Sequence, residues 1–384
     1  MIYLDYSATT PVNEEVLNSY IEATKKMVGN PNSLHKLGIE AKSLIDAATR
    51  QIASILKVKP NEIIYTSGAS ESNNTAIKGI CLKYQNRGKH IITTHLEHSS
   101  IMEPLNYLKR QGFEVEYVNI TENGIVDIED LKKKIRDDTI LVTIASINSE
   151  VGIVQPIKEI AALLKKYPKV YFHSDITQSL GKEKVDLTDV DLASFSAQKF
   201  YGMKGIGGLV KKENVVIEPL IHGGKSTTKD RSGTPATALI VSMAKALRLA
   251  YENLEEKQKY VKELNIFLRN ELEKNEITIN SPEVAIPNIL NISLENIKPE
   301  TVLHALEEKE IYISTKTACA TNDSSDAVYA ITKDEEKAKH SLRISLSYLT
   351  TKKELEIFIT ELVRIRSELS SCLLYTSDAA DDKA

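Results

Sequence analysis

An alternation of short apolar runs and helix-periodic segments between residues 62 and 196 constrains the fold more than any other feature of this sequence. The predicted strands are 62–66, 90–94, 114–118, 139–146, 169–174 and the run that ends before Lys199, and the predicted helices are 70–87, 100–111, 127–136 and 157–167. This order is typical of a mainly parallel sheet with helices on both faces. Ligands bind beyond the carboxyl ends of the strands of such sheets, so we expect functional residues directly after strands.

The segments on either side of this region complete a prediction of two domains. A helix is predicted over 13–28 and a long helical region over 235–275, after which the pattern changes. The later strands and helices favour a smaller α+β domain; they are 288–293, 299–309, 311–314, 341–346 and 352–369. We predict an N-terminal arm at 1–12, a large domain at 13–258 and a small domain at 259–370. Residues 371–384 change composition abruptly and are expected to be an unstructured or non-native tail.

Bulk properties exclude several classes of function. The 384 residues carry a formal net charge of −4 and no basic face that would indicate a nucleic acid partner. No apolar run reaches membrane-spanning length, and the N-terminus lacks the pattern of a signal peptide. The three cysteines, Cys81, Cys319 and Cys372, form neither a disulfide framework nor a zinc pattern, and we predict no metal site. We expect a cytoplasmic protein that does not bind membranes.

Two residues after predicted strands have complementary chemistry. Lys199 follows an apolar run that ends in Ser-Ala-Gln, and burial there would disfavour its ammonium and free the amine to form a Schiff base. Taken alone, Lys199 is better explained as one surface lysine among many. Asp175 ends another apolar run, and a buried carboxylate is unfavourable unless a cation or a donor meets it. A protonated pyridine nitrogen is such a partner.

Other polar residues follow strands in the same way. The stretch 66–73, Thr-Ser-Gly-Ala-Ser-Glu-Ser-Asn, closes one strand and opens a helix, where backbone N–H groups and the hydroxyls of Ser67 and Ser70 can meet an anion. An ordinary capped helix start explains this stretch equally well. His98 could stack on a bound ring and move protons, although a structural histidine would also explain it. Asn148 offers an amide donor in a turn after a later strand.

Together these residues indicate pyridoxal 5′-phosphate (PLP) as a cofactor. The aldehyde of PLP needs Lys199, its ring nitrogen needs Asp175, and its phosphate needs the small-residue turn at 66–73. Gln178 can hydrogen-bond the ring hydroxyl.

At this point the chain resembles the class V aminotransferase superfamily, in particular the NifS/IscS-type cysteine desulfurases. The resemblance runs from Tyr3 to about Arg366. It rests on motifs in order along the chain, namely residues 3–11, 29–31, 66–73, 97–98, 175–179, 199–202, 204–207, 222–224, 231–234, 287–291 and 318–319. It implies the type I fold of PLP-dependent transferases, an α/β fold with a mainly parallel seven-stranded sheet in the large domain and a smaller α+β C-terminal domain.

The resemblance also implies roles for residues around the cofactor ring. Lys199 would be the Schiff-base lysine, Asp175 the partner of the pyridine nitrogen, and His98 an acid/base that stacks on the ring. Asn148 and Gln178 would lie near the ring hydroxyl, with Asn148 also near the substrate.

Further residues are implied to bind the phosphate and the substrate. Arg343 resembles the arginine that binds the substrate carboxylate, a role that suits a bidentate guanidinium. The phosphate would be held by Ala69, Ser70, Ser196, Gln198 and, from the neighbouring subunit of a homodimer, Thr234.

Cys319 falls at the position of the family's nucleophile. Its segment, 314–323, is polar and carries Lys316, and a nearby cation favours the nucleophilic thiolate. Cys81 lies in an apolar run instead, as a buried structural cysteine does.

Three departures from the family's pattern stand out. Gln198 replaces a histidine next to the lysine; it can donate to a phosphate but cannot titrate. Residues 315–317, Thr-Lys-Thr, replace a serine-glycine-serine sequence before the cysteine, and residues 225–230 lack the usual glycine and glutamate. The last two departures concern loop dynamics, turnover rate and the sulfur acceptor more than the cofactor.

The resemblance implies the conversion of L-cysteine to L-alanine, with sulfur held as a persulfide on Cys319. A sulfur-acceptor protein for iron–sulfur clusters or for tRNA thiolation would take the sulfur. Two alternatives remain on the same scaffold, a selenocysteine lyase and an aminotransferase. A third is a non-catalytic sulfur-trafficking subunit.

Overall fold

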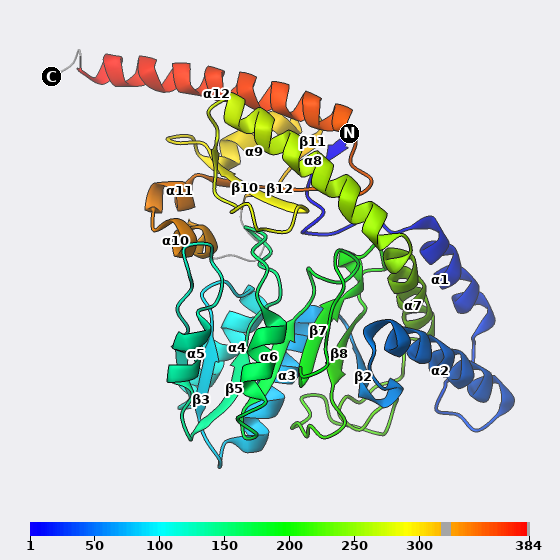
Figure 1. Cartoon of the computed structure of the whole chain (residues 1–384). Helices are drawn as coiled ribbons and strands as arrows, with labels where there is room; N and C mark the ends of the chain where they lie inside the picture. Colours follow the sequence, from blue (N-terminus) through cyan, green and yellow to red (C-terminus); the bar gives the residue numbers. More distant parts are fainter. Residues whose placement is uncertain (316–323, 382–384) are drawn as a thin grey trace.

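The computed structural model describes residues 1–315 and 324–381, with side chains described as far as residue 370. Its main sheet has the strand order β2-β8-β7-β6-β5-β3-β4 (Figure 1). The strands are β2 (Ile63–Thr66), β3 (His90–Thr93), β4 (Glu114–Tyr117), β5 (Thr139–Thr143), β6 (Tyr171–Asp175), β7 (Leu192–Ser196) and β8 (Gly207–Lys211). Neighbours are parallel, except that β8 runs antiparallel to β2 and β7. The prediction of a mainly parallel seven-stranded sheet is confirmed.

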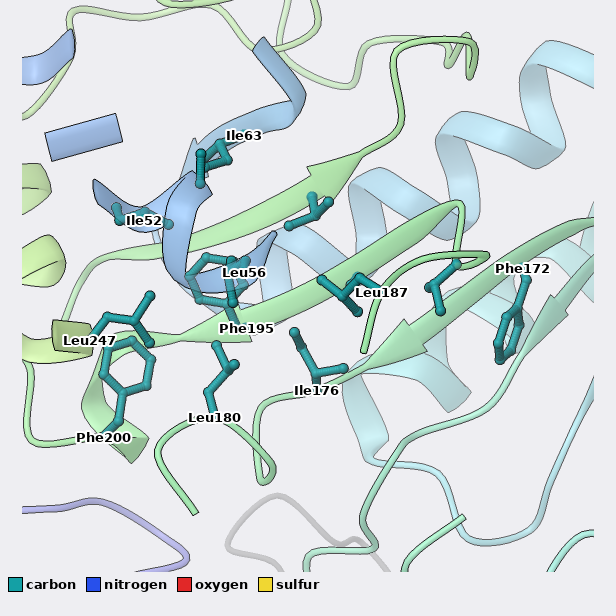
Figure 2. Packing of buried hydrophobic residues seen from close by; sticks show 14 of the residues in the cluster. Ile52, Leu56, Ile63, Phe172, Ile176, Leu180, Leu187, Phe195, Phe200 and Leu247 are labelled. Carbon is teal, nitrogen blue, oxygen red and sulfur yellow. The ribbon is translucent and has the colours of Figure 1, made fainter. Parts of the chain in front are cut away.

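Successive residues of the strands point to opposite faces, and both faces are covered. Ile91 and Leu141 pack with α3 (Ala69–Tyr84) and α4 (Ser99–Arg110), whereas their neighbours Ile92 and Val142 pack into a larger core on the other face. That core, part of which is shown in Figure 2, contains Phe195 and residues from the helices of the second face. These helices are α1 (Glu14–Lys26), α2 (Lys36–Leu56), α5 (Ile128–Lys134), α6 (Ile157–Leu164) and α7 (Thr237–Tyr251).

A second unit with its own apolar core follows α7 (Figure 1). It consists of α8 (Leu254–Lys274), β9 (Thr278–Ile279), β10 (Ile289–Ser293), α9 (Pro299–Glu307), β11 (Ile311–Tyr312), α10 (Asp326–Thr332), α11 (Glu335–Lys339), β12 (Ser341–Ser345) and α12 (Lys352–Asp381). The N-terminal strand β1 (Ile2–Tyr3) pairs with β11, and Ile2 and Leu4 lie in the core of this unit. Within the described ranges, no helix combines the length and the apolar composition needed to cross a bilayer.

Three features differ from the sequence prediction. The helical region 235–275 is two helices, separated at Asn253, which has a φ of 53° in the left-handed region that asparagine tolerates. Strand β8 was not predicted because it begins with Gly207 and Gly208, and glycine is depleted in strands. Helix α12 continues to Asp381, into the segment expected to be unstructured, and no Gly or Pro interrupts residues 371–381.

Gly208 allows β7 and β8 to pair closely beneath a phenylalanine ring, which leads to a testable prediction. A Cβ atom at Gly208 would lie 2.4 Å from Cζ of Phe195, its partner residue on β7. We expect Gly208→Ala to lower the free energy of unfolding by about 1–3 kcal/mol, because Phe195 is fully buried and cannot move aside. Thermal and urea unfolding measure the effect.

Gly224→Ala is the matched control, since a Cβ atom at Gly224 would meet nothing within 4 Å. A second variant, Gly208→Ala with Phe195→Leu, should recover part of the loss by removing ring atoms. Equal stability of Gly208→Ala and the wild type would contradict this explanation of the glycine.

Candidate active site

A cavity of about 370 Å³ lies beyond the carboxyl ends of β2, β5, β6 and β7. The N-terminal arm contributes Ser7 and Ala8 to its wall, and β12 of the second unit contributes Arg343. The tertiary structure brings together in this wall most of the site residues predicted from the sequence: Ala69, Ser70, His98, Asp175, Gln178, Ser196, Gln198, Lys199 and Arg343.

Lys199 enters the cavity from η2 (Ala197–Lys199), a single 3-10 turn that follows β7 directly. Its Nζ atom donates to the carbonyl oxygens of Ser7 and Ala8, at 2.7 and 2.6 Å. The backbone carbonyl of Gln198 in turn accepts from the N–H and the hydroxyl of Thr10. The N-terminal arm and the lysine turn therefore hold one another in place.

Asp175 ends β6 with its carboxylate almost fully buried, at 7% exposure. Oδ2 accepts from Nδ2 of Asn73 at 2.9 Å, and Oδ1 accepts from the backbone N–H of Thr177 at 2.9 Å. Two neutral donors do not balance a buried negative charge, so the carboxylate is suited to meet a cation in the cavity that it lines.

His98 is the N-cap of α4, and its ring lies in the cavity wall. Nδ1 is 3.1 Å from the backbone N–H nitrogen of Ser100 and 2.8 Å from the Ser100 hydroxyl. The pKa of His98 lies below the ordinary value, because burial disfavours the imidazolium more strongly than the nearby Asp175 carboxylate favours it.

The first turn of α3 forms the anion-binding part of the wall. Gly68, its N-cap, has a φ of +154° and provides no side-chain cap, so the N–H groups of this turn face the cavity next to Ser70 and Ser196. Gly207 of β8 lets this turn lie against the sheet, since a Cβ atom there would be 2.7 Å from Cα of Gly68.

Glu71 is a negative charge in the same wall, and its partners offset it. Oε1 accepts from Nε of Arg231 at 2.8 Å, and Oε2 accepts from the backbone N–H of Ser67 at 2.7 Å. Burial raises the pKa of Glu71, but these hydrogen bonds outweigh burial and hold the pKa below its usual value. The ion pair reduces the repulsion that a bound phosphate would meet.

Arg343 is buried to 2% exposure, yet it keeps a donor without a protein partner. Nη2 donates to Oδ1 of Asp5 at 2.8 Å, and Nη1 donates to the carbonyl oxygen of Ser149 at 3.0 Å. Nε has no hydrogen-bond partner among the described residues. Arg343 lines the cavity, and its guanidinium is of the type that pairs with a carboxylate.

Gln178 has its amide orientation fixed by a second lysine. Oε1 accepts from Nζ of Lys182 at 2.6 Å, and Nε2 donates to the carbonyl oxygen of Ser7 at 3.0 Å. The amide N–H group of Gln178 therefore points toward Ser7 of the arm, in the wall of the cavity. Burial, the Lys199 ammonium and Arg343 together lower the pKa of Lys182 to about 7.

Two predicted residues do not line this cavity. Asn148 holds the turn after β5, where its side chain donates to the Leu96 carbonyl and accepts from the N–H groups of Glu150 and Val151. Thr234 lines a separate cavity of about 110 Å³, together with Arg231 and Ser67. Since Ser67 lines both cavities, the two are neighbours.

The predicted nucleophile, Cys319, lies outside the described residues, as does Lys316. Ser314, on the described side of that segment, forms two backbone hydrogen bonds with Arg343, at 2.7 and 3.1 Å. Cys81 is fully buried in α3, and burial raises the pKa of its thiol, in agreement with the structural role predicted for it.

Several residues of the site were missed by sequence reasoning. Asn73 ends the stretch 66–73, and its spacing of four residues from Ala69 places both on one helix face, which is a usable signal. Ser100 and Lys182 carried no comparable signal, and Asp5 was noted only as part of the arm. Each acts by holding a predicted residue, which depends on tertiary packing.

The residues present fit PLP. The cavity combines an amine, a buried carboxylate held by two neutral donors, and a helix N-terminus without a side-chain cap next to two hydroxyls. Lys199 would hold the aldehyde carbon, Asp175 the ring nitrogen, and Gly68, Ala69, Ser70 and Ser196 the phosphate.

The chain was compared with known proteins. The family model for aminotransferase class-V matches residues 2–358. A curated relative, cysteine desulfurase IscS of Dictyoglomus turgidum, is 38% identical, over 98% of this chain and 97% of its own length. Among solved structures, a NifS-like protein is 37% identical with a TM-score of 0.90, over 95% of this chain and 99% of its own. A structure described as SspA in complex with cysteine is 32% identical with a TM-score of 0.80, over 91% and 100%.

The matches span both units of the fold and the arm that closes the cavity. This extent, together with the amine, carboxylate and helix N-terminus in one wall, shows that the chain belongs to the aminotransferase class-V family of PLP-dependent enzymes.

Proposed function

We propose that this protein is a PLP-dependent cysteine desulfurase, which converts L-cysteine to L-alanine and transfers the sulfur to a cysteine of its own. The observation that carries the proposal is the single cavity that holds the Lys199 amine, the buried Asp175 carboxylate and the Arg343 guanidinium. Relatives of nearly the same length are named cysteine desulfurase, and the similar structure of SspA contains cysteine.

The Arg343 guanidinium can hold the substrate carboxylate. Asp5 and Ser149 keep its two terminal nitrogens in place, and the residue lines the cavity that the substrate would enter. Because Asp5 belongs to the N-terminal arm and Ser149 to the turn after β5, the arginine is fixed to both walls before substrate arrives.

The cofactor, when bound, supplies an electron sink for the substrate's α-carbon. Lys199 carries the α-proton on Nζ, where the Ser7 and Ala8 carbonyls hold the amine. Asp175 offsets a positive charge on the ring nitrogen.

We assign the nucleophile to Cys319. Its thiolate attacks the substrate sulfur, the Cβ–S bond of cysteine breaks and an S–S bond forms. The former Cβ gains a proton, so the products are L-alanine and a persulfide on Cys319, with atoms and electrons balanced. The position of Ser314, bonded to Arg343 at the start of the segment that carries Cys319, supports this assignment.

The persulfide sulfur would pass to an acceptor protein in the cytoplasm, either for iron–sulfur cluster assembly or for tRNA thiolation. A selenocysteine lyase and an aminotransferase use the same cofactor and are distinguished by their products. Incubation with L-cysteine and a reductant should give equal amounts of alanine and sulfide. Pyruvate or another keto acid would contradict the proposal.

Removal of the nucleophile separates sulfur transfer from cofactor binding. We expect Cys319→Ala to lower alanine and sulfide formation by at least about 100-fold, because no thiolate remains to take the sulfur. The visible absorbance of bound PLP should persist. Cys81→Ala is the matched control and should keep its activity, since Cys81 is buried in α3. Desulfuration at the normal rate in Cys319→Ala would exclude this mechanism.

Arg343 should act on substrate binding more than on turnover. We expect Arg343→Lys to raise KM for L-cysteine about 10- to 100-fold, which corresponds to the about 1.5–3 kcal/mol of a charge-assisted hydrogen bond. Steady-state kinetics separate KM from kcat. Arg269→Lys is the control, because Arg269 is half-buried but binds Asn265 and two carbonyls away from the cavity. An unchanged KM in Arg343→Lys would remove the arginine from the substrate site.

Thr234 tests the proposed homodimer. Thr234 does not line the cavity that holds Lys199 of its own chain. Its proposed contact is with the PLP phosphate in the neighbouring subunit, and this contact requires a dimer. We expect twice the mass of one chain by light scattering, and weaker PLP retention on dialysis for Thr234→Val than for the control Thr237→Val. A monomer that retains PLP fully would contradict both expectations.

A further inference from the structure

A hydrogen-bonded chain links Asp175 to His98 through two residues with no assigned role. Nδ2 of Asn73 is 2.9 Å from Oδ2 of Asp175 and 2.8 Å from Oγ of Ser100. Oγ of Ser100 is 2.8 Å from Nδ1 of His98, and the backbone nitrogen of Ser100 is 3.1 Å from the same atom. Asn73 is fully buried and Asp175 nearly so, whereas Ser100 and His98 are partly exposed in the cavity wall.

The donor and acceptor in each of these bonds follow from chemistry. A carboxylate only accepts, so the amide nitrogen of Asn73 faces Asp175 and uses one of its two protons there. Its second proton goes to Oγ of Ser100. The Ser100 hydroxyl proton is then left for Nδ1 of His98.

The backbone of Ser100 gives the same result independently. An N–H group only donates, so Nδ1 of His98 must be an acceptor and cannot carry a proton. The proton of the neutral ring is therefore on Nε2, which has no protein partner among the described residues, on a ring that lines the cavity.

We infer that Asn73 and Ser100 are positioning residues that hold His98 as a neutral imidazole with its proton on Nε2. His98 then acts on the substrate as a hydrogen-bond donor and not as a base, because Nε2 is already protonated and Nδ1 is occupied by two donors. This inference rests on the proposed function only for the identity of the substrate.

The charged groups around His98 have opposing effects on its pKa, so the position of the ring proton is decided by the hydrogen bonds. Asp175 and Glu150 favour the imidazolium, whereas Lys199 and Arg343 disfavour it. Burial also acts against the imidazolium and keeps the pKa of His98 below its ordinary value. A lower pKa extends the neutral form toward acidic pH.

The tautomer can be measured directly by ¹⁵N NMR of the histidine side chains in the PLP-loaded protein. The wild type should show His98 protonated on Nε2 alone across neutral pH. In Asn73→Ala the Ser100 hydroxyl loses the donor that directs its proton toward Nδ1, and Asp175 loses a donor. Both changes favour the imidazolium, so the pKa of His98 should rise, whereas the neutral ring should keep its proton on Nε2 because the Ser100 backbone N–H remains.

The pH dependence of kcat should change together with the pKa of His98. Because the neutral ring is the active form, a higher pKa of His98 moves the acidic limb of the kcat profile to higher pH in Asn73→Ala and Ser100→Ala. At neutral pH we expect kcat to fall about 10-fold in either variant. Ser100→Thr keeps the hydroxyl and should restore the wild-type profile. Asn74→Ala and Ser99→Ala are controls at adjacent positions and should match the wild type.

A neutral His98 ring protonated on Nδ1 in the wild type would overturn the inference, as would a pKa of His98 and a pH profile in Asn73→Ala that are both unchanged from the wild type. If Asn73→Ala does not fold, Ser100→Ala with Ser100→Thr gives the same test. The NMR result does not depend on the substrate, so a protein with the expected tautomer but no activity on L-cysteine would contradict the proposed function alone.

Discussion

The site depends on a carboxylate buried at the end of a strand. Asp175 continues a strand that is covered on both faces, so its charge is unfavourable unless donors and a cation surround it. Asn73 supplies one donor from α3, and the turn that precedes α3 can lie against the sheet because Gly207 leaves room for Gly68. The position of one helix thus sets both the partner of the carboxylate and the anion-binding turn.

The N-terminal arm joins the two units of the fold at the cavity. Ile2 and Leu4 pack in the core of the second unit, whereas Asp5 pairs with Arg343 and the carbonyls of residues 7 and 8 hold Lys199. The amine that binds the cofactor and the arginine proposed for the substrate are therefore both held by one short segment. A displacement of the arm would therefore disturb the cofactor-binding lysine and the substrate-binding arginine together.

The sequence predicted most of the main sheet and the residues at its carboxyl edge, because the order of strands and helices is visible in the apolar pattern. Parallel strands that are apolar throughout require helices on both faces, and this order brings every strand end to one side. It did not predict β8, since Gly207 and Gly208 are poor strand residues that are needed for close approach to Gly68 and Phe195. Nor did it separate Asn148, which holds a turn, from the residues of the cavity wall.

By itself, the sequence determined which chemical groups are available: the amine of Lys199, the carboxylate of Asp175, the imidazole of His98 and the guanidinium of Arg343. The first three follow from residue type and from position after a strand, which are local properties, whereas Arg343 followed from the family resemblance. Only the tertiary structure decided the state of each group. Asn73 and Ser100 select the nitrogen of His98 that carries the proton, and Asp5 and Ser149 orient the guanidinium of Arg343. Such assignments need contacts between residues far apart in the chain, because a hydrogen bond depends on distance in space and not on spacing in sequence.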